Sequence, residues 1–307
     1  MTTESANTVE SGKAEPQPVE FAAADGTPLS GRFFAAANSP RSNPVLVCAA
    51  TDVPQRFYTA FARWLSEQGV AVLTFDYRGI GASLRESHVR HCRARKQDWG
   101  QVDMPAALDC LKERTGADSV DLIGHSAGAQ LVGLMPNHGS IRRVLMVAAS
   151  SGYVWGLRFP YSIAAYAYLR FYLPATAWGL GYSPGRAIGM GEDLPAGVAR
   201  QWSRWCLRPG YVANEFGRGV DRHYYDEFRS PILSLYASDD SIATVRNVED
   251  LLRLFPSAPK QSACLEPSRF NVPSFGHIDF FRVSRGAAWP LALDWLREGK
   301  SPQPTTV

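Results

Sequence analysis

Residues 119–128, Ser-Val-Asp-Leu-Ile-Gly-His-Ser-Ala-Gly, are the most informative stretch of this chain. The first five are typical of a short buried strand, and residues 127–134 are typical of a helix start. The motif Gly124-His125-Ser126-Ala127-Gly128 therefore falls on a sharp turn from strand to helix. Such a turn strains its central residue and needs small neighbours, so it would raise the Ser126 hydroxyl above the sheet edge. We predict that Ser126 is a nucleophile.

Length and composition indicate a globular protein with a large core. The chain has 307 residues, of which 45% are hydrophobic and 20% are charged, and these fractions are ordinary for a globular protein. A formal net charge of +3 is too small to predict binding to nucleic acid. The densest basic patch, residues 90–96, is expected to be a solvated loop.

The cysteines and the chain ends predict a cytoplasmic location. Five cysteines are scattered without the spacing of metal ligands, which favours reduced thiols. Residues 1–18 lack the basic start and apolar stretch of a secretion signal, so we expect a disordered tail there and a second tail over residues 298–307. Arg170 and Pro174 interrupt the apolar run 160–182, so no transmembrane segment is expected, whereas peripheral membrane contact stays open.

Strand and helix patterns alternate between the two tails. Residues 19–21 and 29–35 flank a turn at Asp25-Gly26 and predict an antiparallel hairpin. The alternation predicts an α/β fold with a mostly parallel sheet and helices on both faces, in which ligands bind at the carboxyl ends of the strands. Further strands are expected at residues 44–50, 70–77, 119–123, 143–149, 231–236 and 262–265, and helices at 55–68, 99–114, 127–134, 244–255 and 286–296.

Two further motifs lie at expected carboxyl ends of strands. The motif around Ser126 also fits an ordinary glycine-rich turn, so a nucleophile there needs a base and an acid at the same edge. Asp240 follows the strand 231–236, and His277 follows the last strand. The order Ser126, Asp240, His277 is that of α/β-hydrolases and differs from both common protease orders. Asp239 is expected to hydrogen-bond within its own turn, so Asp240 is favoured over Asp239 as the acid.

Six short motifs carry a closer resemblance: residues 54–58 (PQRFY), 75–79 (FDYRG), 124–128 (GHSAG), 201–206 (QWSRWC), 276–277 (GH) and 280–282 (FFR). On these, residues 19–297 resemble the α/β-hydrolase superfamily. Within it the chain is similar to a bacterial group of predicted hydrolases related to monoglyceride-lipase and serine-aminopeptidase-like enzymes. The resemblance implies an α/β-hydrolase core over residues 19–150 and 231–297, with a helical lid inserted at 151–230.

The resemblance also implies an oxyanion hole. One donor would be the backbone N–H of Ala127. The second would come from the loop after the strand 44–50, which reads Ala-Ala-Thr-Asp-Val over residues 49–53. A carboxylate aimed inward would repel the developing oxyanion, so the Asp52 side chain is expected to turn outward. The second N–H is then that of Thr51 or Asp52.

These features predict a serine hydrolase that cleaves a small-molecule acyl substrate, an apolar carboxylic ester or thioester, and imply no cofactor and no metal. The lid is rich in aromatic residues, of which most are expected to pack on the core and a minority to line an acyl pocket. A non-catalytic binding module, with its oxyanion loop spoiled by Asp52, stays open as an alternative. A peptidase also stays open, and it would bind its substrate amine with a lid carboxylate from among Glu192, Asp193, Glu215, Asp221, Asp226 and Glu227.

Overall fold

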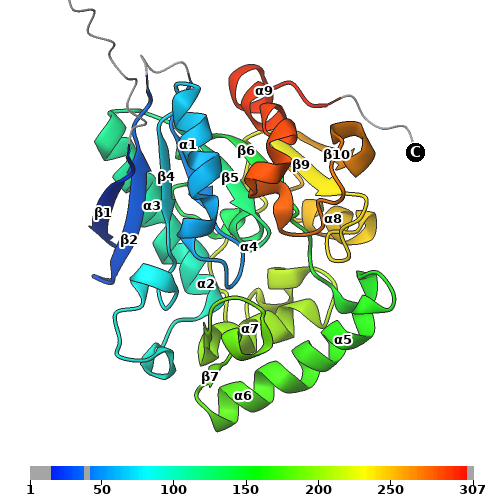
Figure 1. Ribbon diagram of the computed structural model, residues 1–307. Coiled ribbons are helices and arrows are strands. Elements are labelled where there is room, and N and C mark those ends of the chain that lie inside the picture. The colour runs from blue at the N-terminus through cyan, green and yellow to red at the C-terminus, as the bar shows by residue number, and fades with distance from the viewer. Residues whose placement is uncertain (1–14, 38–41, 303–307) are drawn as a thin grey trace, which may run out of the picture.

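Figure 1 shows the computed structural model of the chain, which describes residues 15–37 and 42–302. Eight strands form one sheet in the order β1-β2-β4-β3-β5-β6-β9-β10. Of the predicted tails 1–18 and 298–307, residues 1–14 and 303–307 lie outside the described residues. The strands are β1 (Gln17–Ala22), β2 (Pro28–Phe34), β3 (Val45–Cys48), β4 (Val72–Phe75), β5 (Val120–His125), β6 (Ile141–Val147), β9 (Ile232–Ala237) and β10 (Lys260–Leu265).

The sheet is antiparallel at one edge and parallel elsewhere. β1 pairs antiparallel with β2, and β2 with β4, whereas β3 pairs in parallel with both β4 and β5. β6, β9 and β10 extend the parallel part. β3 and β5 are buried along their whole length, as expected for strands covered on both faces. The predicted mostly parallel sheet and its antiparallel hairpin are therefore confirmed.

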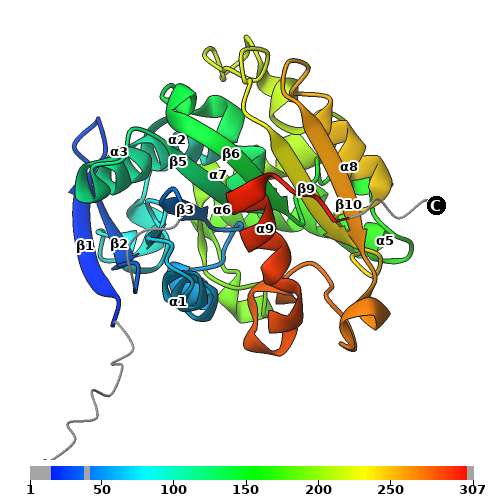
Figure 2. The same cartoon turned by 90° about the horizontal axis from the view of Figure 1, so that it is seen from above.

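Helices cover both faces of the sheet, as predicted (Figure 2). α1 (Thr59–Glu67) and α9 (Pro290–Glu298) lie on one face, and α3 (Met104–Thr115) and α8 (Val245–Leu252) lie on the other. The single turn α2 (Lys96–Asp98) and a π-helical turn, Trp99–Asp103, lead into α3. The short α4 (Ala127–Gln130) follows β5 directly and so places its N-terminus at the carboxyl end of the sheet.

The segment between β6 and β9, residues 151–230, forms an insertion beyond the carboxyl ends of the strands (Figure 1). α5 (Tyr161–Ala167), a π-helical turn (Tyr168–Tyr172) and α6 (Leu173–Gly179) form one continuous rod. α7 (Ala196–Cys206) lies between this rod and the sheet, and β7 (Tyr182–Ser183) pairs with β8 (Leu194–Pro195). Within residues 15–37 and 42–302, no helix is both long enough and apolar enough to cross a membrane.

Most elements differ by a few residues in extent from the predictions, and three of these differences are instructive. β1 begins at Gln17, inside the predicted tail 1–18, because Gln17 already pairs with Phe33 of β2. The helix expected at 127–134 is α4 followed by a 3-10 turn, Val132–Leu134. The helix expected at 286–296 begins as a 3-10 turn, and α9 starts at Pro290, a residue that fits the first helical position because it has no N–H to leave unpaired.

Candidate active site

Ser126 lies on the tight turn between β5 and α4. Its backbone has φ 47° and ψ −108°, a conformation that a residue with a side chain rarely adopts. Gly124 and Gly128, two residues before and two residues after Ser126, are packed so closely that neither position has room for a side chain. A Cβ at Gly124 would lie 2.4 Å from the nitrogen of Ala129, and one at Gly128 would lie 2.2 Å from the oxygen of Cys48. The two glycines therefore permit the turn that presents Ser126.

Ser126, His277 and Asp240 form a continuous chain of hydrogen bonds. His277 Nε2 lies 3.1 Å from Ser126 Oγ, and His277 Nδ1 lies 2.8 Å from Asp240 Oδ2. The N–H groups of Ile242 and Ala243 donate to Asp240 Oδ1 at 2.7 and 3.0 Å. Burial alone would raise the pKa of Asp240, but His277 and these donors outweigh it and hold the pKa below its usual value. The structure thus brings together the three residues predicted for the triad.

Asp239 has other partners than those predicted. Its carboxylate accepts the N–H of Phe275 at 3.0 Å and the N–H of Gly276 at 3.1 Å. The expectation that Asp239 hydrogen-bonds within its own turn is therefore wrong, because two N–H groups of the His277 loop come within its reach. The two neighbouring carboxylates have separate roles: Asp240 contacts the imidazole, and Asp239 fixes the backbone that carries it.

His125 is buried next to Ser126 and connects two loops. Its Nε2 lies 2.9 Å from the His277 carbonyl oxygen, and its Nδ1 lies 2.8 Å from the Tyr58 hydroxyl. The carbonyl can only accept, so Nε2 carries the proton and Nδ1 accepts from Tyr58. The Tyr58 oxygen accepts the N–H of Ala50 at 2.9 Å. Burial lowers the pKa of His125 to about 3, so the ring is neutral near pH 7. We call these contacts the Tyr58–His125 chain.

The candidate oxyanion donors lie on two adjacent loops. Ala127 is the first residue of α4, so its N–H has no partner within the helix. Thr51 and Asp52 follow β3, the strand that pairs with β5. In the described part of the chain, the N–H groups of Thr51 and Asp52 donate to no protein acceptor. Both predicted candidates for the second donor therefore have a free N–H.

The Asp52 side chain is buried, whereas the sequence predicts that it turns outward. Asp52 is only 8% exposed, and its φ of 59° is a left-handed conformation that Asp tolerates better than most residues. The prediction is wrong because the insertion covers this loop. The Asp52 carbonyl accepts the N–H of Glu192 at 2.8 Å, and a Cβ at Gly191 would lie 2.6 Å from the same oxygen. Burial raises the pKa of the Asp52 carboxyl well above its usual value.

Lys96, which the sequence places in a solvated loop, is fully buried beside the same loop. Its ammonium donates to Thr51 Oγ1 at 2.5 Å. Nζ also lies 5.0 Å from the ring centre of Trp99 and 5.3 Å from that of Trp202. Burial lowers the pKa of Lys96 to about 7, while the nearby Asp52 carboxylate favours the charged form. Sequence reasoning assigned no role to this residue.

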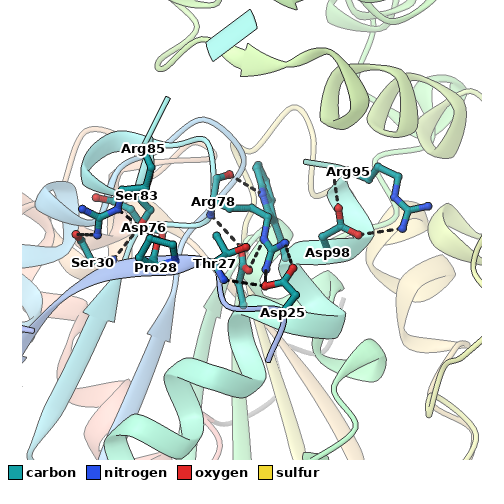
Figure 3. Close-up of polar contacts among 12 residues, drawn as sticks. Asp25, Thr27, Pro28, Ser30, Asp76, Arg78, Ser83, Arg85, Arg95 and Asp98 are labelled. Atoms are coloured by element: carbon teal, nitrogen blue, oxygen red, sulfur yellow. Dashed lines mark hydrogen bonds and ion pairs between the residues drawn. The ribbon is translucent and has the colours of Figure 1, made fainter. Parts of the chain in front are cut away.

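Two polar clusters hold the chain where it leaves β4 (Figure 3). Arg78 donates from Nε to Asp103 at 2.6 Å and from Nη1 to Asp25 at 2.6 Å. The hydrogen bond from Arg78 lowers the pKa of Asp25 to about 2. Asp76 accepts the N–H of Gln55 at 2.7 Å, which fixes the start of the segment leading to α1. Both clusters anchor loops, and neither contacts the triad.

Two tyrosines of the insertion lie near the catalytic edge. Burial, and then the carboxylates of Asp240 and Asp52, raise the pKa of Tyr161. Burial and the Asp52 carboxylate raise the pKa of Tyr168 as well. Tyr168 packs edge-on against Trp202, with ring centres 5.8 Å apart. Both tyrosines are therefore within electrostatic reach of Asp52, and Tyr161 is also within reach of Asp240.

A sequence model of the alpha/beta hydrolase family matches residues 28–294. The chain belongs to the alpha/beta hydrolase family. The match runs from β2 into α9 and so includes the turn at Ser126 and the loops of Asp240 and His277. No curated protein matches the sequence of this hydrolase.

Solved structures of hydrolases share the fold at low sequence identity. The alpha/beta hydrolase GrgF from Penicillium sp. sh18 is 17% identical, with a TM-score of 0.59 over 92% of this chain and 98% of that chain. The Pyrococcus furiosus esterase PF2001 is 14% identical, with a TM-score of 0.58 over 96% and 94% of the two chains. The esterase domain of a Rhodothermus marinus protein is 20% identical, with a TM-score of 0.55 over 92% and 98%.

Proposed function

We propose that this hydrolase cleaves apolar carboxylic esters or thioesters through a Ser-His-Asp triad and an acyl-enzyme. The observation that carries the proposal is the hydrogen-bond chain from Asp240 through His277 to Ser126, which has the order of orienting acid, base and nucleophile. The backbone strain at Ser126 supports the proposal, because proteins retain such strain mainly where function needs it.

In the first half of the reaction, Ser126 Oγ attacks the acyl carbon while His277 Nε2 takes its proton. Asp240 accepts the Nδ1–H of His277, which presents Nε2 to the serine and stabilises the imidazolium. His277 then gives the proton to the leaving alcohol or thiol, and an acyl-serine remains. In the second half, water gives a proton to His277 and attacks the acyl carbon, and the acid leaves as Ser126 regains its proton.

The N–H groups of Ala127 and Thr51 would hold the oxyanion, with the N–H of Asp52 as the alternative to that of Thr51. Thr51 is favoured because Lys96 fixes its side chain. Each donor of this kind typically contributes about 3 kcal/mol in the transition state. Burial favours a neutral Asp52 carboxyl, and the neighbouring Lys96 offsets its charge when it ionises, so both reduce the repulsion that Asp52 would otherwise exert.

The insertion supports an apolar acyl group as the substrate. We propose that it acts as a lid whose inner face, with Tyr161 and Tyr168, borders the acyl pocket. Aromatic rings provide apolar surface at little entropic cost, and their hydroxyls orient a bound carbonyl compound without demanding a charge on it. A small uncharged ester therefore fits this edge of the sheet better than a charged substrate.

A peptidase is less well supported, because the buried acids of the insertion are already paired. Glu192 forms ion pairs with Arg56 and Arg186, and Glu215 forms one with Arg204. Neither carboxylate is free to bind the amine of a peptide. The other candidates, Asp193, Asp221, Asp226 and Glu227, are at least partly exposed.

We also propose a cytoplasmic location, on the chemistry of the cysteines. All five are free thiols, and Cys48, Cys92 and Cys206 are buried. Burial raises the pKa of the Cys92 thiol to about 11, which keeps it protonated and unreactive near pH 7. Free thiols persist in a reducing compartment, and expression with a thiol-labelling readout in separated cell fractions tests the location.

The function is tested by the hydrolysis of p-nitrophenyl esters of increasing acyl length. The wild type is expected to show an optimum in length, and Ser126→Ala is expected to lose at least about four orders of magnitude in kcat. Ser257→Ala removes an exposed serine and serves as the matched control, with no change expected. A fluorophosphonate should label the wild type and Ser257→Ala but not Ser126→Ala.

Two outcomes would count against the proposal. A wild type that neither turns over the esters nor reacts with the fluorophosphonate would favour the non-catalytic binding module. A wild type that is labelled but cleaves only amide substrates would favour the peptidase, and the ester specificity would be withdrawn.

A further inference from the structure

The insertion carries most of the exposed large apolar side chains in the described part of the chain. Of the eleven large apolar residues that are exposed in the described ranges, nine lie between residues 155 and 190. Phe159, Phe171 and Trp178 are 76%, 58% and 88% exposed. Single exposed apolar residues are ordinary, but their concentration on one segment indicates an interaction surface. We call Phe159, Ile163, Phe171, Trp178 and Leu180 the outer face.

The rod of α5, the π-helical turn and α6 is apolar on both of its long sides. Leu169, Leu173 and Ala177 are buried on the side of the rod that packs against α7, whereas Ile163 and Trp178 are exposed. Figure 1 shows the rod as the outermost layer of this end of the molecule. A helix that is apolar all round is normally buried on all sides. In the part of the chain that the structure describes, nothing covers the outer face.

The charges around the outer face indicate what covers it. Between residues 154 and 191 the chain has three arginines and no acidic residue. Arg158 and Arg170 are exposed, and Arg186 pairs with Glu192. A second copy of the chain would bring the arginines of both copies together without acids to pair them. An anionic lipid surface offers both an apolar layer for the aromatic side chains and phosphates for the arginines.

We propose that the outer face docks on an anionic lipid bilayer, with the rod lying in the plane of the headgroups. Phe171 and Trp178 enter the boundary between headgroups and acyl chains, where aromatic side chains are favoured. The Arg170 guanidinium lies 5.6 Å from the ring centre of Phe171, so an inserted Phe171 brings this cation to the level of the phosphates. The docking needs no catalytic step and stands apart from the proposed hydrolase mechanism.

Binding of the full chain to vesicles tests the proposal. The wild type is expected to sediment with vesicles of phosphatidylcholine mixed with phosphatidylglycerol, and to bind vesicles of phosphatidylcholine alone at least about tenfold more weakly. Added salt should weaken binding to the mixed vesicles, because it screens the arginines from the lipid phosphates. The double variant Phe171→Glu/Trp178→Glu should lose binding to the mixed vesicles by more than about tenfold.

The matched control is Val245→Glu/Val283→Glu, which adds the same two charges at valines that are 51% and 73% exposed outside the insertion. It is expected to bind like the wild type. Thermal melting of both double variants should stay near the wild-type value, because all four side chains are exposed. If only Phe171→Glu/Trp178→Glu has a changed melting temperature, Trp178→Phe separates lost binding from lost stability. This variant keeps an aromatic ring and should still bind the mixed vesicles.

Trp178 fluorescence provides a second readout. Brominated lipid should quench the tryptophan fluorescence of the wild type more than that of Trp178→Phe, because the proposal places the Trp178 indole at the boundary between headgroups and acyl chains. The proposal is overturned if the wild type does not bind the mixed vesicles, or if Phe171→Glu/Trp178→Glu binds as well as the wild type. It is also overturned if light scattering shows a wild-type dimer that this variant abolishes, since a second copy would then occupy the outer face.

Discussion

The loop before α4 and the loop after β3 meet at the same edge of the sheet, but they are held in place differently. The first is held by close backbone contacts, of Gly124 with Ala129 in its own turn and of Gly128 with Cys48 in β3. Gly124 and Gly128 pass so close to surrounding backbone that a single added carbon would overlap it, and this closeness leaves Ser126 one conformation. Steric contacts within its own turn and with the central strand β3 therefore define the position of the nucleophile.

The second loop is held by residues far away in the sequence. Lys96 donates to the Thr51 hydroxyl from 45 residues away, and Glu192 donates to the Asp52 carbonyl from within the insertion. Half of the candidate oxyanion hole therefore depends on the core, whereas the other half depends on how the insertion and α2 pack. Substitutions at the two loops should therefore fail in different ways.

Among substitutions that test this difference between the two loops, Gly128→Ala is expected to have the largest effect. Its Cβ would lie 2.2 Å from the Cys48 oxygen, so the turn must move or the strands must part. We expect a loss of about 3 kcal/mol or more in the free energy of unfolding. We also expect about a thousandfold loss of esterase activity, because the Ala127 N–H moves with the turn. Gly139→Ala, which meets nothing within 4 Å, is the control in urea unfolding and in kinetics.

Thr51→Val and Thr51→Ser separate the effect of the Thr51 hydroxyl on kcat from the effect of side-chain size. Thr51→Val removes the acceptor of the Lys96 ammonium, and we expect kcat to fall about tenfold to a hundredfold with little change in KM. Thr51→Ser keeps the hydroxyl and should remain close to the wild type. In a double-mutant cycle, Lys96→Met should lower kcat much less in the Thr51→Val background than in the wild type. Additive effects would show that Lys96 does not position this loop.

Gly191→Ala probes the contact from the insertion to the same loop. The new Cβ would lie 2.6 Å from the Asp52 carbonyl, at a φ of 107° that side chains rarely adopt. We expect kcat to fall about tenfold, with a smaller effect on melting than for Gly128→Ala. Gly189→Ala has a similar positive φ but meets nothing within 4 Å, and it should leave kcat unchanged. Equal losses in both variants would point to backbone strain alone.

His125→Gln should change how stability depends on pH. The pKa of His125 is lowered from 6.5 to about 3, so between these values the unfolded chain binds a proton that the folded chain does not. The free energy of unfolding therefore falls as the pH falls, by up to about 1.4 kcal/mol per pH unit. Urea unfolding between pH 6 and pH 4 should show a flatter slope for His125→Gln. An unchanged slope would mean that other groups dominate acid unfolding.

Much of the fold and the nearness of the triad residues follow from local patterns. Continuous apolar runs predict strands covered on both faces, and the carboxyl ends of parallel strands must share one edge. Asp240 and His277 each follow a strand of the parallel part of the sheet, so their approach to Ser126 could be predicted without knowing a single tertiary contact. The first and last residues of the helices and strands were less predictable, because helix ends such as that of α4 depend on packing.

The contacts around Thr51 could not be predicted in this way. Arg93 and Arg95 are exposed, as expected for a basic patch, and nothing in the pattern distinguishes Lys96 from them. Its burial results from α7 and the Asp52 loop closing over α2, and these segments are far apart in the sequence. The positive φ of Asp52 leaves only a weak signal in the sequence, since Asp is one of several residues that tolerate this conformation.

The Tyr58–His125 chain gives this hydrolase an internal spectroscopic reporter. The Tyr58 hydroxyl proton and the His125 Nε2 proton are both sealed from water, so they should exchange slowly with solvent. In a sample with 15N-labelled histidine, the His125 Nε2–H should give a resolved NMR signal that persists near neutral pH. Because that proton is donated to the backbone carbonyl of His277, its chemical shift would report each displacement of the base during turnover.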